Sequence, residues 1–88
     1  MFKIWARVQK GDKILKSVMF AREEKFTADS FFGYVTEICQ LLDIPVPVIL
    51  ESHIQHFVKF NITRFAPSDF IDTVDFGRFI LESVPLEK

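Results

Sequence analysis

The stretch TADSFFGYVTEICQLLDI, residues 27–44, carries the strongest structural signal in the chain. At about 100° per residue, its large apolar side chains fall within one half of a helix, and Gly33 and the polar residues fall in the other half. Thr27 is a suitable N-cap, Asp29 suits the positive end of the helix dipole, and Pro45 stops the helix by restricting the residue before it. The sequence therefore predicts an amphipathic helix, with this apolar face: Phe31, Phe32, Tyr34, Val35, Ile38, Cys39, Leu41 and Leu42.

The segment before this helix alternates in the manner of a strand. In FKIWARV, residues 2–8, the apolar set Phe2, Ile4, Ala6 and Val8 faces one way, and Lys3, Trp5 and Arg7 face the other way. This period of two is typical of a half-buried strand. Gly11 marks a turn, and KILKSVMF, residues 13–20, is predicted to be the returning strand of a hairpin.

The type of turn decides which residues of the second strand join the core. A turn that holds a bulge, with Gly11 at positive φ, would put Ile14, Val18 and Phe20 on the core face of the first strand. A two-residue turn would put Leu15 and Met19 there instead. We favour the turn with the bulge.

The segment after the helix is predicted to hold a strand, a second helix and a last strand. The residues VILE, 48–51, form a short apolar run typical of a buried strand. Ser52 and Gln55 match a capping box, which predicts a helix from about Ser52 into the low sixties. Pro67 is suited to open a short helical turn, and residues 76–84 are predicted to form the last strand.

These elements predict one α+β domain over residues 1–88. The expected order is strand, strand, helix, strand, helix, strand, which favours a single four-stranded mixed or antiparallel sheet. Both helices are expected on one face of this sheet. The opposite face would then carry Lys3, Trp5 and Arg7.

The supply of aromatic side chains is large for so short a chain. Hydrophobic residues make up 49% of the sequence, and 11 of its 88 residues are Phe. A core of this size has limited room, so left-over Phe residues would form an exposed patch of the kind that marks a partner surface. This surplus favours a homo-oligomer, most simply a homodimer, or another protein partner.

Charge and cysteine content narrow the class further. The net charge is −1, whereas nucleic-acid binders usually carry a basic excess. Residues 1–25 are basic and residues 66–88 are acidic, which is the pattern expected if the two ends lie together and offset each other. The single cysteine, Cys39, fits a reducing compartment, and no signal peptide or membrane span is expected, so we predict a cytoplasmic protein without membrane contact.

The two histidines, His53 and His56, are predicted to lie on the surface of the second helix. On a helical wheel they fall outside the sector of apolar residues, beside Phe60 and Arg64. As metal ligands, His53, His56 and Glu51 are weak candidates, because a structural zinc site wants four ligands and the spacing lacks the zincin pattern. No phosphate loop or nucleophile–base arrangement is apparent, so neither catalytic activity nor a cofactor is expected.

Two surfaces are therefore candidates for interaction. The first combines His53, His56, Phe60 and Arg64, since an exposed aromatic beside Arg resembles an interface anchor. The second is the sheet face with Lys3, Trp5 and Arg7, where an aromatic among basic residues could stack on single-stranded nucleic acid. Asn61 falls inside the apolar sector, so either its amide caps buried backbone groups near the helix end or the helix is distorted there.

The sequence leads to a functional hypothesis with two alternatives. We expect a small cytoplasmic, non-enzymatic protein–protein interaction module that forms a homodimer. The first alternative is an accessory protein that contacts nucleic acid through Lys3, Trp5 and Arg7. The second is a metal-binding protein or enzyme that uses His53 and His56.

Overall fold

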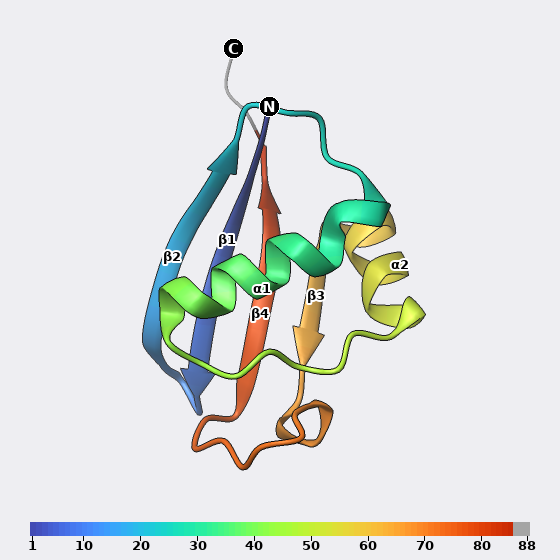
Figure 1. Ribbon diagram of the computed structural model, residues 1–88. Helices are drawn as coiled ribbons and strands as arrows, with labels where there is room; N and C mark the ends of the chain where they lie inside the picture. The colour runs from blue at the N-terminus through green and yellow to red at the C-terminus, as the bar shows by residue number, and fades with distance from the viewer. Residues whose placement is uncertain (86–88) are drawn as a thin grey trace.

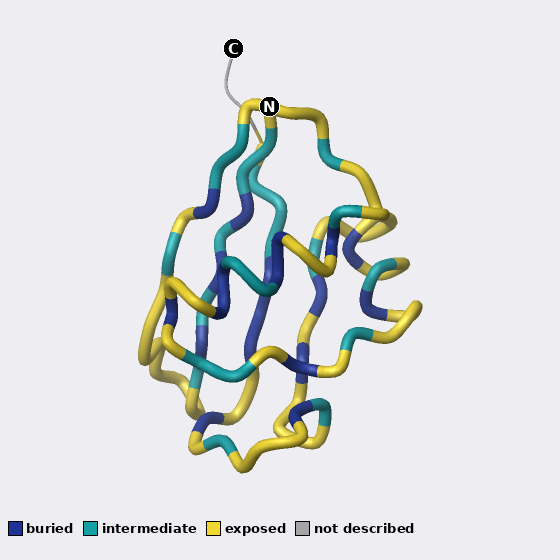
Figure 2. The backbone as a smooth tube through the Cα atoms, in the orientation of Figure 1, coloured by how far each residue is buried: buried dark blue, intermediate teal, exposed yellow. Residues whose placement is uncertain are grey.

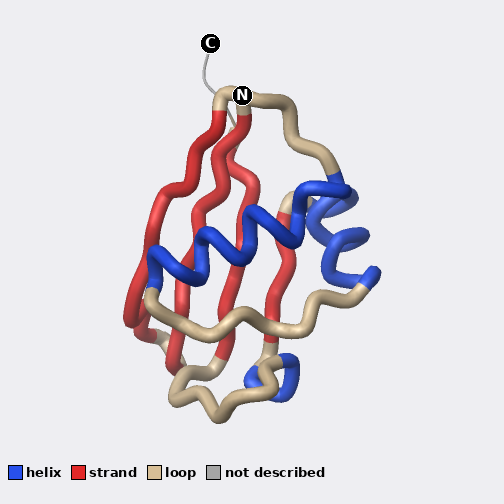
Figure 3. The backbone as a smooth tube through the Cα atoms, viewed as in Figure 1, coloured by secondary structure: helices blue, strands red, loops and turns tan. Residues whose placement is uncertain are grey.

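The fold is a four-stranded antiparallel sheet with two helices, and the computed structural model describes residues 1–85. The sheet order is β2-β1-β4-β3, so β1 and β4 are central. Both helices lie on one face of the sheet, with α1 crossing the strands and α2 beside β3 (Figures 1 and 3). The predicted α+β class is confirmed. The elements are β1 (Phe2–Lys10), β2 (Lys13–Arg22), α1 (Phe31–Leu42), α2 (Glu51–Phe60), β3 (Ile62–Phe65) and β4 (Arg78–Val84), with single 3-10 turns at Ala28–Ser30 and Pro67–Asp69.

The third strand lies in a different segment from the one predicted. In the predicted strand of residues 48–51, residues 48–50 form no strand and Glu51 begins α2. β3 is formed instead by Ile62–Phe65, which were assigned to the second helix. In the predicted segment, the N–H of Val48 donates to the carbonyl of Asp69 and the N–H of Leu50 donates to Nδ1 of His53, so neither is available for a ladder. In the second segment, Asn61 ends the helix and β-branched residues follow it, and such residues favour a strand. The observed order is therefore strand, strand, helix, helix, strand, strand.

The β1–β2 hairpin contains both a two-residue turn and a bulge. Lys10 pairs with Lys13 across Gly11, whose φ of 61° is typical of the first central residue of a type II′ turn. The register then shifts, because Val8 pairs with Lys16 and Gln9 pairs with Ile14, which leaves one extra residue in β2.

This register shift decides which β2 side chains reach the core. The predicted core positions of Val18 and Phe20 are confirmed, since Val18 packs against the core and Phe20 is buried. The prediction for Ile14 is wrong. Ile14 lies between the turn and the bulge, where the inward–outward alternation of β2 is opposite to that beyond the bulge, and it is 47% exposed.

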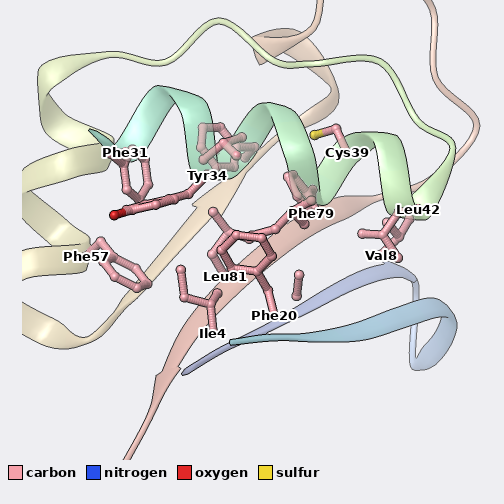
Figure 4. Packing of buried hydrophobic residues seen from close by; sticks show 14 of the residues in the cluster. Ile4, Val8, Phe20, Phe31, Tyr34, Cys39, Leu42, Phe57, Phe79 and Leu81 are labelled. Atoms are coloured by element: carbon pink, nitrogen blue, oxygen red, sulfur yellow. The ribbon is translucent and has the colours of Figure 1, made fainter. Parts of the chain in front are cut away.

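The core lies between α1, α2 and the inner face of the sheet. Ile4, Ala6 and Val8 of β1 meet Phe31, Val35 and Ile38 of α1 there, and Figure 4 shows how these layers interlock around Phe79 and Leu81. Figure 2 shows that the buried residues follow this interface. The buried face of α1 is narrower than the predicted apolar face, because Phe32 and Leu41 at its margins are 62% and 61% exposed.

The core absorbs most of the Phe residues. Phe32 and Phe60 are the two exposed ones, and the other nine are buried or packed against the core: Phe2, Phe20, Phe26, Phe31, Phe57, Phe65, Phe70, Phe76 and Phe79. The Phe surplus inferred from composition is thus confined to two side chains, one on each helix.

Neither helix within residues 1–85 is both long enough and apolar enough to cross a bilayer.

Candidate functional site

His53 is a buried residue, which corrects its predicted place on the surface. Its exposed fraction is 7%, and its ring lies against that of Phe65 with the centroids 4.2 Å apart. The helical wheel gave the wrong position for His53 because β3 begins only two residues after α2 and packs against it. The side of α2 that faces β3 therefore includes His53 as well as Phe57. His56 is exposed, as predicted.

Both ring nitrogens of His53 have neighbours that fix its role. The backbone N–H of Leu50 donates to Nδ1 at 2.9 Å, so Nδ1 is the acceptor and Nε2 carries the proton in the neutral ring. Nε2 lies 3.5 Å from Oδ2 of Asp69, which also accepts the N–H of Ala66 at 2.8 Å. His53 therefore connects the start of α2 to the 3-10 turn at Pro67–Asp69.

This environment favours the neutral imidazole. Burial lowers the pKa of His53 below its ordinary value, while the negative charge of Asp69 and its hydrogen bond act in the opposite direction and the charge of His56 adds to the lowering. A general base needs a nitrogen that is free to accept a substrate proton. The Nδ1 acceptor is already occupied by a backbone donor, so the His53–Asp69 pair is a structural connection.

The predicted metal ligands are not brought together. Glu51 accepts a hydrogen bond from Gln55 at 3.2 Å, and the acceptor nitrogen of His53 is engaged by Leu50. Within residues 1–85 there is no group of three His, Cys, Asp or Glu side chains able to hold a metal ion. Cys39 lies in the core, where burial raises the pKa of its thiol to about 12, so it is neither an accessible ligand nor a nucleophile.

Asn61 is neither buried nor inside a distorted helix. It is the C-cap of α2 in the left-handed conformation, with φ of 62°, and its N–H donates to the carbonyl of Phe57 at 2.9 Å. Asn tolerates this conformation better than most residues. Its carbonyl accepts the N–H of Ser83 at 2.7 Å, so this single residue both ends the helix and starts the pairing of β3 with β4.

Three of the four residues of the first predicted surface line one hollow at the edge of the sheet. His56 and Phe60 come from α2, and Ile62, Thr63 and Arg64 come from β3. This α2–β3 hollow has a volume of about 420 Å³ and opens to solvent. Phe60 is 65% exposed, and its ring lies 5.9 Å from that of His56.

The β3 side of the hollow has unused hydrogen-bonding capacity. The Asn61–Ser83 bond and the antiparallel alternation of the ladder direct the backbone groups of Thr63 and Phe65 toward β4. The N–H and C=O groups of Ile62 and Arg64 then point to the open edge. Thr63 is 1% exposed, and its Oγ1 has no hydrogen-bond partner within residues 1–85. The capacity of β3 for a further contact therefore lies in the backbone groups of Ile62 and Arg64, because the buried Thr63 hydroxyl is closed to solvent.

The second predicted surface is largely satisfied within the chain. The guanidinium of Arg7 lies 4.0 Å from the ring centroid of Trp5, and its Nη1 is 3.0 Å from Oε1 of Glu82. Lys3 lies on the same outer face, paired with Val84 of β4. The Trp5 ring is covered by Arg7, whose charge is offset by Glu82, so little stacking surface remains for a nucleic acid.

Comparison of the chain with protein-family models, curated proteins and solved structures gives no match. Within residues 1–85 the chain is described by its fold, an antiparallel α+β domain with an open hollow beside the edge strand β3.

Two features of this region were missed at the sequence level, namely the His53–Asp69 connection and the edge strand β3. A signal for His53 was present, because the third helical position is where a capping-box side chain reaches back to the N-cap amide. With the helix started at Glu51, Leu50 becomes the N-cap and His53 that third residue. Gln55, to which the prediction gave this role, lies two residues further along the helix.

Proposed function

We propose that the chain is a non-enzymatic protein–protein interaction module that forms a homodimer through the α2–β3 hollow. The observation that carries the proposal is the position of Phe60. It is the more exposed of the two Phe side chains outside the core, and it borders an open hollow beside a strand edge. An exposed aromatic next to His and Arg has the composition of an interface anchor.

The reactive side chains His53 and Cys39 are engaged or protonated inside the protein, which supports binding in preference to catalysis. Both nitrogens of the buried His53 face protein groups, and the buried Cys39 holds its proton. An open edge strand is itself a site where another chain can pair, because its backbone groups lack partners. We include the cytoplasm in this proposal, since a chain with the single cysteine Cys39 suits a reducing compartment.

Sedimentation equilibrium over a wide concentration range tests the proposal. The wild-type chain is expected to reach twice the chain mass of 10.3 kDa at micromolar concentration. Phe60→Ala should raise the dissociation constant about tenfold or more, as the loss of an interface anchor does. Phe32→Ala is the matched control, because Phe32 is 62% exposed on the other helix and outside the hollow.

Two results would contradict this proposal. A wild-type chain that stays monomeric up to millimolar concentration would remove the homodimer. Equal weakening by Phe60→Ala and Phe32→Ala would separate the dimer from the α2–β3 hollow.

A further inference from the structure

The loop of residues 70–75 presents the most exposed large hydrophobic side chain of the described chain. Ile71 is 90% exposed. The loop is nevertheless held in place, because the rings of Phe70 and Phe76 are buried with centroids 5.3 Å apart and Val74 packs against the core. A fixed loop that holds out one apolar side chain loses little conformational entropy on binding, which favours a role in contact.

The charge of this loop is opposite to that of the α2–β3 hollow. Asp72 and Asp75 are exposed on the loop, and within residues 1–85 neither forms an ion pair. Arg64 lines the hollow, and Lys59 is exposed on α2 three residues after His56, where it borders the same side. Neither base has an acidic partner within the described residues, whereas Arg7 and Arg22 are paired with Glu82 and Glu37.

We propose that the α2–β3 hollow of one copy receives the acidic loop of residues 70–75 from a second copy, and that the contact is made twice. The inference rests on the proposed homodimer and specifies its contact. Ile71 of each copy packs against Phe60 of the other, and Asp72 lies near Arg64. The acidic loop and the basic hollow are complementary, which supplies both attraction and register.

The fold places the two halves of this contact where a two-fold axis can pair them. Figure 1 shows that β3 runs from the end of α2 to the 3-10 turn at Pro67–Asp69. The loop continues from there along that end of the sheet, where residues 73–76 line a hollow with Val8, Leu15 and Lys16. Turning a second copy end for end sets its loop beside the first hollow and its hollow beside the first loop. Such an isologous interface closes on itself and stops at a dimer. The free backbone groups of Ile62 and Arg64 can then pair with the incoming segment, as in strand addition.

Single substitutions on the loop test the contact by sedimentation equilibrium. Ile71→Ser should raise the dissociation constant of the dimer about tenfold. Met19→Ser is the matched control, since Met19 is also exposed but lies on β2 at the opposite edge of the sheet, and it should leave dimerisation unchanged. Far-ultraviolet circular dichroism and urea unfolding should show that both variants are folded, because both side chains are on the surface.

A charge exchange tests the register. Asp72→Lys and Arg64→Glu should each weaken dimerisation several-fold, and the double variant should recover most of the loss because an opposite-charge pair is restored. Glu23→Lys is the control for a change of net charge alone. Glu23 is exposed and directly follows β2, the edge strand opposite β3. Equal effects of Asp72→Lys and Glu23→Lys would overturn the proposed register.

A mixing experiment tests whether the contact is made twice. Phe60→Ala and Ile71→Ser each damage both contacts of their own dimer. In the mixed dimer, the unchanged loop of the Phe60→Ala copy meets the unchanged hollow of the Ile71→Ser copy, so one contact is intact. The other contact lacks both Phe60 and Ile71, which costs about as much as lacking one of them because the two side chains pack against each other. The mixture should therefore associate more tightly than either variant alone.

The outcomes separate the inference from the proposed function. A monomeric wild-type chain defeats both. A wild-type dimer that is weakened by Phe60→Ala but unaffected by Ile71→Ser and Asp72→Lys keeps the hollow as the interface and overturns the loop as its occupant.

Discussion

Leu50 and His53 are joined by two reciprocal hydrogen bonds across the first turn of α2. The N–H of His53 donates to the carbonyl of Leu50 at 3.0 Å, and the N–H of Leu50 donates to Nδ1 of His53 at 2.9 Å. The histidine thus acts as the reaching-back residue of a capping box, in which the N-cap Leu50 has no polar side chain of its own. Its ring is held in place by Phe65 on one side and Asp69 at the other nitrogen.

Replacing the two histidines should have unequal effects on stability. His53→Ala is expected to lower the free energy of unfolding by about 2 kcal/mol, through the lost cap and the lost packing of a buried ring. His53→Gln should lose about half as much, because Gln can restore the hydrogen bond to the Leu50 amide. His56→Ala should stay within about 0.5 kcal/mol, as is usual on the surface. Urea unfolding measures all three, and equal losses at the two positions would contradict the structure.

The same residue predicts a dependence of stability on pH. Burial lowers the folded-state pKa of His53, so below the ordinary value of 6.5 the unfolded chain binds a proton more readily than the folded chain. Its contribution is therefore present above pH 6.5 and declines as the pH falls toward the folded-state value. The wild-type free energy of unfolding should fall from pH 7 to pH 5.5 more steeply than that of His53→Gln. If the pH dependence is flattened by His56→Gln and not by His53→Gln, it belongs to His56, and the prediction for His53 is wrong.

Two glycines should respond in opposite directions to substitution by alanine. Gly11 has φ of 61°, and no atom lies within 4 Å of an added Cβ, so Gly11→Ala is opposed by backbone conformation alone, at about 1 kcal/mol. Gly33 lies inside α1 with equally open space and no positive φ, so Gly33→Ala should stabilise the chain by about 0.5–1 kcal/mol. Thermal unfolding of both variants checks the pair, and a stabilised Gly11→Ala would refute the type II′ turn.

Trp5 fluorescence distinguishes the interaction module from a nucleic-acid binder. Arg7 covers the Trp5 ring and is itself paired with Glu82, so single-stranded oligonucleotide should leave the emission unchanged even at low salt. Arg7→Ala, by contrast, should alter the emission of the free protein. Quenching of the wild-type chain that fades as salt is added would support the nucleic-acid alternative.

Segments with a strong local pattern were predicted well. The alternation of residues 2–8 placed Ile4, Ala6 and Val8 on the core face, and the structure buries all three. The apolar face of residues 27–44 predicted α1, and Pro67 predicted the 3-10 turn that it opens. In each case the signal lies within a few neighbouring residues, because side-chain periodicity and proline geometry act locally.

The candidate site could be predicted only in part for the same reason. His56, Phe60 and Arg64 were grouped as one face of a helix, whereas the structure places them on the two walls of a hollow. Arg64 reaches the hollow because the chain reverses at Asn61, whose left-handed conformation is not encoded by helical periodicity. His53 was misplaced because its burial comes from Phe65 and Asp69, residues on the far side of that reversal.

The sequence by itself determined the class, the hairpin, the first helix and the last strand, since each rests on a local period or a turn residue. The tertiary structure alone decided the identity of the third strand, the register past the bulge before Lys16, and the burial of His53. All three depend on contacts between segments that lie apart in the sequence. Val48 and Leu50 direct their N–H groups to Asp69 and His53, and Ile62–Phe65 take the place beside β4, with which they form the antiparallel ladder.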